Sequence, residues 1–418
     1  MKKLFTFIAV ICLALNASAQ YQLTNPGFEG TWTSCTPYTG GSSTSVGQNP
    51  PNWCISHVAG YKLFGITWTG STSVGESVKG NTGNNACYIY NVEMMKNIIP
   101  GYVSLGTTWN TANLTGGNAD GGVFGGVPFD GRPDAIEFYY KRTAADNSQP
   151  ASVVAYLWKG ETEQESVPVS VDSSNPTKVP MKNRDRNILG MSYSKGGAVT
   201  YSQDFKLIAS LKTNDEHVVK LTEIKENWTK ATFEFTYNSV DDAPTMINVV
   251  FSAMDYFVDR SNHKKDNTLT VDDVRFVYYS QLKSLTVDGV SVPDFDKDVY
   301  NYTVDSYYVE GTTSVVAVDN TKVGVATIAK NYDATTGKYT IVVTNQEGSE
   351  FHTYTIQFKT YEKGDVNKDG SVTIADVTML VNMILGKAEK NEMANINGDD
   401  DVTIADVTAL VNIILGKN

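Results

Sequence analysis

The chain from Tyr21 to about Ser280 alternates short apolar runs with turn-forming residues. Runs such as AIEFYYK, ATFEFTY and TMINVVFSA are rich in aromatic and β-branched residues, and clusters of Gly, Asn, Asp and Pro separate them. Apolar and polar residues that alternate in this way fit strands with one buried face. Many short strands of this kind predict a jelly-roll β-sandwich over residues 20–280.

The spacing of the apolar residues changes twice further along the chain. Residues 281–361 contain strand-like runs at tight intervals, such as KYTIVVT, and predict a small seven-stranded sandwich of the immunoglobulin-like class. After Glu362 the period becomes helical, because two runs place apolar residues at i, i+3, i+4, i+7 and i+8. The two runs are Val377, Leu380, Val381, Ile384 and Leu385, and then Val407, Leu410, Val411, Ile414 and Leu415. We therefore expect a mainly β chain with a small α-helical domain at residues 362–418.

The first 19 residues have the pattern of a secretory signal peptide. Two lysines precede an apolar run over residues 4–15, and Ala17-Ser18-Ala19 matches the A-x-A cleavage signal. No run in the chain reaches the roughly 20 apolar residues that a membrane helix needs. We expect cleavage near Ala19 and a secreted or cell-surface-associated protein without a transmembrane segment, periplasmic or on the outer surface in a Gram-negative bacterium.

Charge and cysteine content narrow the choice of partners and compartment. A formal net charge of -12 argues against nucleic acid, because phosphate backbones bind to positively charged surfaces. Cys35 and Cys54 flank a loop rich in Gly, Ser and Pro, and are candidates for a disulfide in an oxidising compartment. The alternative is that Cys35, Cys54 and Cys87 are buried reduced thiols.

Residues 365–376 fit a twelve-residue calcium loop. Such a loop supplies oxygens at positions 1, 3, 5, 7 (from the backbone), 9 and 12, and has a glycine at position 6 for the turn. Gly370 occupies position 6, and every ligand position carries a suitable residue. The predicted calcium ligands of this first loop are Asp365, Asn367, Asp369, the carbonyl of Ser371, Thr373 and Asp376.

Residues 395–406 repeat the loop with two departures. Asn395 replaces the charged first ligand, and Asp400 replaces the turn glycine. One fewer ligand charge predicts a weaker calcium site. The predicted ligands are Asn395, Asn397, Asp399, the carbonyl of Asp401, Thr403 and Asp406. For either loop, an acidic turn without metal is the alternative.

Two loops of the form DxNxDGxxTxxD, each followed by one helix, resemble the dockerin type I module, a calcium-dependent plug for cohesin domains. The resemblance covers Gly364 to Gly416 and implies calcium as cofactor and a cohesin-like or other surface protein as partner. It also implies that the two residues before the last ligand contact the partner. These are Ile374-Ala375 and Ile404-Ala405 here, where related modules often carry Ser or Thr. The alternative is a calcium-locked cap that packs on its own chain.

The N-terminal domain is similar to the carbohydrate metabolism domain of exported Bacteroidetes proteins. The motifs NPGFEGTW at residues 25–32, F-x-x-R-P-D-x-x-x-x-Y-Y-K at residues 129–141 and LTVDDVRFVYY at residues 269–279 carry this resemblance. It implies a jelly-roll, galactose-binding-like fold with glycan as a candidate ligand. The segment after it resembles cadherin-like and immunoglobulin-like spacers.

The jelly-roll resemblance implies candidate sites in the first domain. A structural metal would be held by Glu29 with Asp272 or Asp273, which would join the first strand to the last. A solvated Glu29 and a turn at Asp272-Asp273 are the alternative. Glycan recognition usually needs exposed aromatic rings beside polar groups. Three tryptophans in Gly-, Ser- and Asn-rich stretches are the candidates, with core packing as the alternative for each: Trp53, Trp68 and Trp109.

No catalytic motif is present in the sequence. The four histidines are scattered, and there is no H-E-x-x-H, G-x-S-x-G or phosphate-loop pattern. We therefore expect no catalytic residues and a non-catalytic, carbohydrate-binding or surface protein with a calcium-dependent C-terminal module. The alternatives are an adhesive or structural protein without a sugar ligand, and a polysaccharide-processing enzyme.

Overall fold

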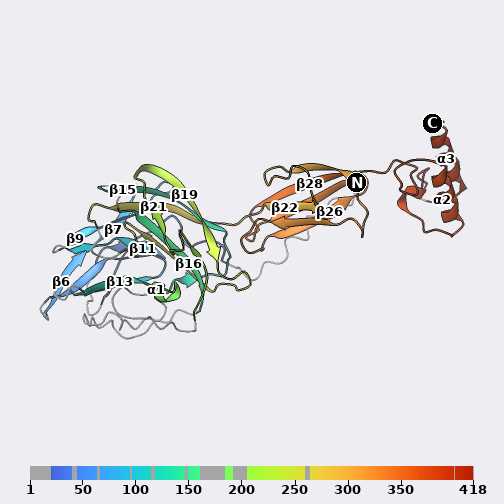
Figure 1. The fold of residues 1–418 in the computed structure, drawn as a ribbon. Helices are drawn as coiled ribbons and strands as arrows, with labels where there is room; N and C mark the ends of the chain where they lie inside the picture. The colour runs from blue at the N-terminus through green and yellow to red at the C-terminus, as the bar shows by residue number, and fades with distance from the viewer. Residues whose placement is uncertain are drawn as a thin grey trace. The chain divides into compact units, whose positions relative to one another are not determined.

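The structure, a computed structural model, describes residues 20–39, 45–63, 66–94, 97–113, 118–145, 149–160, 184–191, 205–258, 264–399 and 401–417. The predicted signal peptide, residues 1–19, lies outside these ranges. As predicted, the chain is mainly β with a small helical region near its C-terminal end (Figure 1). It divides into two compact units. The first extends to Tyr279 and includes residues 321–325 and 345–347, and the second contains the remaining residues from Ser280.

The first unit is built on one long antiparallel hydrogen-bonded path of strands that forms two halves. One half contains, in spatial order, β4 (Cys54–Ile55), β11 (Tyr102–Ser104), β20 (Met246–Ser252), β16 (Ala151–Lys159) and β17 (Lys206–Leu211). The short strands β14 (Val127–Pro128) and β18 (Val219–Leu221) pair with β20 and β16. The other half contains β19 (Lys225–Tyr237), β15 (Ala135–Thr143), β21 (Thr268–Val277), β8 (Ala86–Tyr90) and β7 (Gly75–Val78). The long strand β19 pairs with both β17 and β15 and so joins the halves.

Smaller sheets and one short helix complete the first unit. A further sheet contains β13 (Asn118–Phe124), β12 (Thr107–Asn113), β5 (Val58–Leu63) and β6 (Ile66–Thr72), with β2 (Tyr38–Thr39) beside β12. Two strand pairs are β1 (Thr33–Ser34) with β3 (Gln48–Asn49), and β9 (Val92–Met94) with β10 (Asn97–Ile99). The helix is α1 (Asp185–Ile188).

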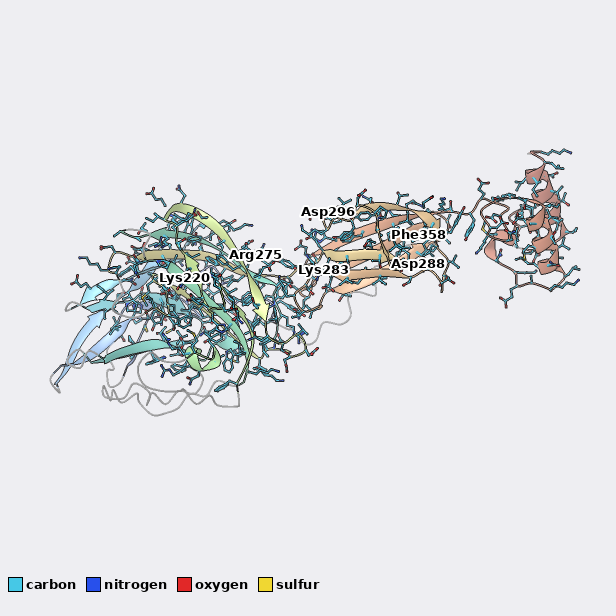
Figure 2. All side chains as sticks on the ribbon, viewed as in Figure 1. Lys220, Arg275, Lys283, Asp288, Asp296 and Phe358 are labelled. Atoms are coloured by element: carbon cyan, nitrogen blue, oxygen red, sulfur yellow. The ribbon has the colours of Figure 1, made fainter. Side chains whose placement is uncertain are left out.

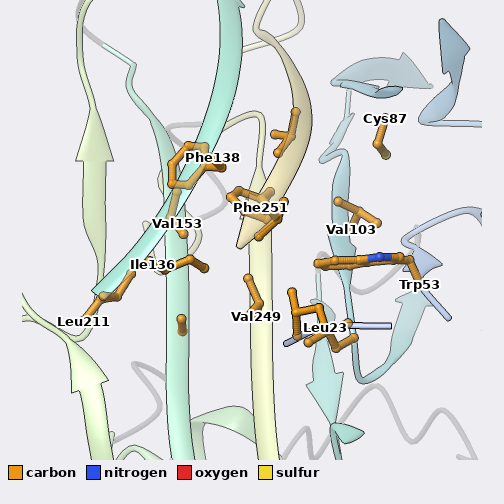
Figure 3. Close-up of a cluster of buried hydrophobic side chains, with 14 of the residues drawn as sticks. Leu23, Trp53, Cys87, Val103, Ile136, Phe138, Val153, Leu211, Val249 and Phe251 are labelled. Carbon is orange, nitrogen blue, oxygen red and sulfur yellow. The ribbon is translucent and has the colours of Figure 1, made fainter. Parts of the chain in front are cut away.

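The core of the first unit lies between the two halves of the long path. Phe138 of β15 and Phe251 of β20 meet edge to face, with ring centroids 4.9 Å apart (Figure 3). Apolar residues at alternate positions of the strands fill the space around them, Val153 and Val249 among them. Burial of these side chains drives the pairing of the halves, at roughly 25 cal/mol per Å² of apolar surface. The apolar positions of the alternating pattern therefore face the core of a sandwich, and the positions between them face outward.

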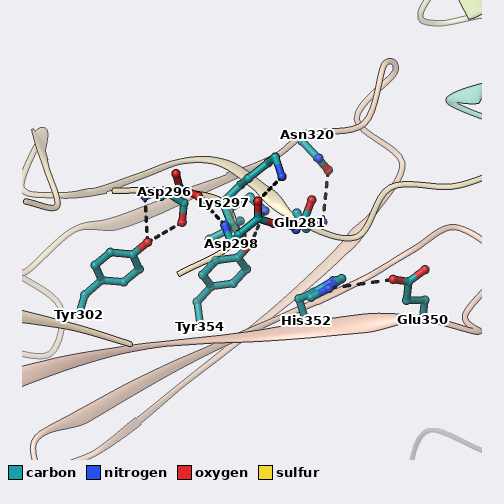
Figure 4. A network of polar contacts seen from close by, with 10 residues as sticks. Gln281, Asp296, Lys297, Asp298, Tyr302, Asn320, Glu350, His352 and Tyr354 are labelled. Carbon is teal, nitrogen blue, oxygen red and sulfur yellow. Dashed lines mark hydrogen bonds and ion pairs between the residues drawn. The ribbon is translucent and has the colours of Figure 1, made fainter. Parts of the chain in front are cut away.

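The second unit begins with a seven-stranded sandwich, the number of strands that the sequence predicts. One sheet contains β23 (Val290–Ser291), β22 (Leu282–Val287) and β25 (Val315–Asp319). The other contains β24 (Asn301–Tyr307), β28 (Phe351–Lys359), β27 (Lys338–Thr344) and β26 (Thr327–Asp333). Two buried tyrosines fasten the connection between β23 and β24. The hydroxyl of Tyr302 donates to the carbonyl of Asp296 at 2.6 Å, and that of Tyr354 donates to the carbonyl of Lys297 at 2.5 Å (Figure 4).

The C-terminal region contains two helices of equal length, α2 (Ile374–Ile384) and α3 (Ile404–Ile414), and the short 3-10 helix η3 (Glu392–Ala394). Their shared core includes Leu380 and Leu410, which occupy the same position in the two copies and are both fully buried. In the described ranges, no helix is long and apolar enough to cross a membrane.

Candidate calcium and docking site

Each C-terminal helix begins at the last residues of its predicted calcium loop. Thr373 caps α2 by accepting the amide N–H of Ala375 at 3.2 Å, and Asp376 accepts the amide N–H of Thr373 at 2.8 Å. Thr403 and Asp406 form the same capping box at the start of α3. The sequence Thr-Ile-Ala-Asp thus satisfies the free N–H groups of a helix start and places the twelfth loop residue at that point. Loop and helix are therefore one local unit in both copies.

Two aspartates of the first loop are fully buried. The carboxylate of Asp365 accepts the amide N–H groups of Asp369 at 3.0 Å and Gly370 at 2.9 Å. The carboxylate of Asp376 accepts those of Thr373 at 2.8 Å and Asn367 at 2.9 Å. These hydrogen bonds wrap the loop around its own first and last predicted ligands.

The loops differ in where they place residues with left-handed backbone. In the first loop, Lys368 at position 4 has φ 62° and Gly370 at position 6 has φ 89°. In the second loop, Gly398 occupies position 4 with φ 81°. Asp400, which takes position 6 there, lies outside the described residues. The second copy thus has a glycine at the position where the first forces a lysine into a conformation that favours glycine.

The second loop closes around Asp406 in the same way. Its fully buried carboxylate accepts amide N–H groups from Ile396 at 2.7 Å, Asn397 at 3.0 Å and Thr403 at 2.8 Å. Burial alone would raise the pKa of Asp406, but these backbone hydrogen bonds outweigh burial and lower it. Asn395 accepts the amide N–H of Gly398 at 2.7 Å.

The donor set of both loops fits calcium. Calcium takes six to eight oxygen ligands from carboxylates, amide and backbone carbonyls, and water. Buried carboxylates are costly unless they are paired or bind a metal, which favours a cation inside each loop. In the described part of the chain, His, Cys, Asp and Glu side chains form no group of three or more that could alone hold a metal. Calcium would therefore need the Asn, Thr and backbone oxygens of the loops as well.

The two predicted docking residues that begin the helices are exposed. Ile374 is 71% exposed and Ile404 is 70% exposed, and Ala375 and Ala405 beside them are exposed too. Part of the predicted apolar stripe is also uncovered, because Leu385 is 61% and Leu415 is 58% exposed at the helix ends. The same kind of apolar surface is therefore presented by both helices.

Residues 363–415 match the family model of the dockerin type I domain. The C-terminal region is a dockerin module. The match includes both loops and both helices, and dockerin type I domains bind calcium and cohesins in general. No curated protein matches the chain. One similar solved structure, described as a "putative glycoside hydrolase" from Bacteroides thetaiotaomicron, is 15% identical, with 60% of this chain and 72% of that chain covered and a TM-score of 0.31.

In the first unit, the carboxylates of Glu29, Asp272 and Asp273 all bind the same loop, which connects β7 to β8. Glu29 accepts the amide N–H groups of Asn84 at 2.6 Å and Asn85 at 3.0 Å. Asp272 accepts that of Asn81 at 2.7 Å, and burial raises the pKa of Asp272 to about 6. Among the described residues these three carboxylates form no group that could alone hold a metal, so the structural metal stays a prediction. In the structure they fasten the β7–β8 loop to the first and last segments of the domain by hydrogen bonds.

Two of the three candidate tryptophans are buried, as in the core-packing alternative, and are not available to a glycan. Trp53 is 3% exposed and Trp109 is fully buried, so the expectation of exposed rings is wrong for both. Trp53 packs on Phe28, and its indole N–H donates to the carbonyl of Asn25 at 2.9 Å. Arg184 covers the ring of Trp109. The side chain of Trp68 lies outside the described residues. A Gly- and Ser-rich neighbourhood in sequence did not indicate exposure here.

Cys35, Cys54 and Cys87 are free thiols in the structure, so the candidate disulfide between Cys35 and Cys54 is not formed. The two thiols are nevertheless hydrogen-bonded to each other, and this contact lowers the pKa of Cys54 to about 6. The hydroxyl of Thr108 lies 3.2 Å from the sulfur of Cys54. Cys87 is fully buried, and burial raises the pKa of its thiol.

Sequence reasoning missed four half-exposed aromatic residues of the first unit. Tyr88, Tyr90, Tyr139 and Trp228 all lie on strands, where we had looked only at loops. The alternation of core-facing and outward-facing positions along each strand could have indicated them. In KENWTKATFEFTY, Trp228 has the parity of Lys230, whereas Phe235 and Tyr237 share the opposite, core-facing parity.

Proposed function

We propose that calcium-dependent docking of the dockerin module to a cohesin-like surface protein holds this chain in place. The observation that carries the proposal is the exposure of Ile374 and Ile404 at equivalent positions of the two helices. Large apolar side chains that are exposed at both positions have no structural purpose within the module. A partner that covers them gains the free energy of apolar burial.

The exposed apolar residues lie on one face of each helix. Ile374 and Leu385 are eleven residues apart, which places them on one side of α2, with the polar Thr378 between them. Ile404, Thr408 and Leu415 repeat the spacing on α3. The opposite sides, with Leu380 and Leu410, form the module's own core. Calcium would fix the loops that begin these faces and so hold the docking residues in place.

A binding assay with the mature chain, residues 20–418, tests this role. We expect a cohesin type I domain to bind in calcium and to be released by a chelator. The double variant Ile374→Asp with Ile404→Asp should weaken binding at least tenfold. Val290→Asp is the matched control, because Val290 is 71% exposed in the sandwich, the same fraction as Ile374. Unchanged binding by the double variant would show that the module docks by another face, and a wild-type chain that binds no cohesin would favour a module that caps its own chain.

The N-terminal domain is, in our proposal, the part that is displayed, and it binds carbohydrate without catalysis. The jelly-roll motifs of the sequence and the half-exposed aromatic residues of its strands support this role. Display requires an exported chain, which the pattern of residues 1–19 predicts. A glycan array with the mature chain tests binding. If the chain retains no glycan, the adhesive alternative holds, and release of new sugar ends from a bound polysaccharide would show an enzyme instead.

A further inference from the structure

One sheet face of the first unit presents aromatic and basic side chains to the outside. On β15, Ile136, Phe138 and Tyr140 point into the core, so Glu137, Tyr139 and Lys141 point outward. The register continues this outer face over the neighbouring strands. Tyr139 lies opposite Lys230 of β19, Lys141 lies opposite Thr270 of β21, and Thr270 lies opposite Tyr88 of β8.

Four half-exposed aromatic residues span this surface: Trp228 on β19, Tyr139 on β15, and Tyr88 and Tyr90 on β8. We call these four residues, together with Lys141, Lys230 and Arg275, the aromatic face. Tyr88 and Tyr90 lie with ring centroids 5.2 Å apart. Because neighbouring strands are about 4.8 Å apart, the three steps from β19 to β8 cover about 14 Å, the reach of a short oligosaccharide. Between the rings lies Thr270, a small side chain that is only 9% exposed.

The centre of the aromatic face is basic. Arg275 and Lys230 both pair with Glu137, at 2.8 Å and 3.1 Å, so two cations share one carboxylate. Their side chains remain 60% and 52% exposed (Arg275 is labelled in Figure 2). The third cation is Lys141, whose Nζ lies 4.6 Å from the centroid of the Trp228 ring. In the described ranges no carboxylate pairs with Lys141.

This charge runs against that of the chain as a whole. The formal net charge is -12, yet three cations face one carboxylate at the middle of this surface. Among the other acidic residues of these strands, Asp272 of β21 lies opposite Tyr139 but is fully buried. Glu234 of β19 pairs with Lys322, and Glu226 on β19 and Glu76 on β7 are exposed. A ligand that matches both features needs flat apolar surfaces for the rings and negative groups for the cations.

We propose that the aromatic face binds an acidic polysaccharide. The sugar rings would stack on Trp228 and Tyr139, and their carboxylates would pair with Lys141 and Arg275. This inference rests on the proposed carbohydrate-binding role of the first unit and names the site and the ligand class for it. A neutral glycan would use the rings and leave the cations without partners. A second copy of this chain would also bring net negative charge, and its self-association is one outcome of the test.

The experiment measures binding of the mature chain to polygalacturonate and to the same polymer after reduction of its carboxyl groups. We expect tighter binding of the acidic polymer, weakening as salt is added. Trp228→Ala with Tyr139→Ala should weaken binding at least tenfold. Lys141→Gln should weaken binding of polygalacturonate severalfold and leave the reduced polymer unaffected. Phe351→Ala is the matched control, because Phe351 is 65% exposed and lies in the second unit.

The outcomes separate this site from the general role. Glycan binding that survives Trp228→Ala with Tyr139→Ala would overturn the aromatic face and leave the carbohydrate-binding proposal standing. Equal affinity for both polymers would overturn the acidic ligand. If the wild-type chain binds no glycan on the array, the proposed function and this inference both fail. Self-association that the aromatic double variant abolishes would identify a second copy as the occupant and would also overturn the inference.

Discussion

The carboxylate of Asp376 accepts the amide N–H of Thr373 at 2.8 Å. The same carboxylate accepts the amide N–H of Asn367 at 2.9 Å, and this second hydrogen bond closes the first loop. One side chain therefore caps α2 and shapes the predicted calcium loop. Helix formation and calcium binding should be coupled, because a charge that is buried without a cation destabilises the fold that the helix needs.

We predict that Asp365→Ala with Asp376→Ala reduces the rise in helicity that calcium produces in the isolated dockerin module, because only the second loop would still bind calcium. Loss of the cap itself should reduce helix stability by about 1 kcal/mol even without calcium. Circular dichroism at 222 nm with calcium and with chelator measures both effects. When the same comparison is made in the full chain, Asp305→Ala is the control, because Asp305 is an aspartate of the sandwich whose side chain is 89% exposed. Equal spectra of the wild-type module in calcium and in chelator would contradict the coupling.

The backbone at position 4 of each loop gives a second prediction. Lys368→Gly should stabilise the first loop by on the order of 1 kcal/mol, because Lys368 holds φ 62° and glycine adopts that conformation without strain. Gly398→Lys should destabilise the second loop by a similar amount, since it puts a side chain at φ 81°. Urea unfolding of the module, followed by the helical signal, measures both changes. Effects of the same sign in the two variants would refute the backbone argument.

Local and long-range features differ in how well the sequence predicts them. The capping box at Thr373 and the glycine at position 6 act within one loop, so spacing alone identifies them. Trp53 is buried by Phe28 and Phe251, and Phe251 comes from a strand about two hundred residues away. The residues next to Trp53 in the sequence do not indicate such a contact. The aromatic face could have been found from strand parity, but only after β19, β15 and β8 were known to be neighbours.

The correction for Trp53 can be measured as stability. Trp53→Ala should lower the free energy of unfolding by about 3–5 kcal/mol, because it removes a buried ring and leaves a cavity. Trp228→Ala should lower it by less than about 1 kcal/mol, because Trp228 is only half-buried on the outer face. Chemical denaturation followed by the remaining tryptophan fluorescence tests the difference. Similar losses for the two variants would mean that Trp228 is part of the core.

The contact between Cys35 and Cys54 predicts rapid oxidation to a disulfide. The lowered pKa of Cys54, about 6, makes it mostly thiolate at neutral pH, and thiolates are the reactive form. The closed loop would add about 3 kcal/mol to the free energy of unfolding. Peptide mapping under non-reducing conditions, before and after mild oxidation, detects the bond. Cys87→Ser should change nothing in that experiment, since Cys87 is fully buried, and persistent alkylation of both Cys35 and Cys54 after oxidation would contradict the prediction.

Buried His57 should make the first unit less stable in mild acid. Its Nε2 donates to the carbonyl of Gln48 at 3.1 Å, and its Nδ1 accepts the amide N–H of Val74 at 3.4 Å, so the folded state holds a neutral ring. Burial lowers the pKa of His57 below its ordinary value of about 6.5. Below that ordinary value the unfolded chain binds a proton that the folded chain does not, so the free energy of unfolding falls as the pH falls. Above it the contribution of His57 is fully present.

Denaturation between about pH 7.5 and pH 5.5 measures this dependence, with His57→Gln as the variant whose stability should vary less with pH. Glutamine keeps a donor and an acceptor but does not titrate in this range. Burial also lowers the pKa of His217, so part of the dependence should remain in His57→Gln and disappear in the double variant with His217→Gln. A pH profile of the double variant that matches the wild type would assign the acid sensitivity to carboxylates rather than to these histidines.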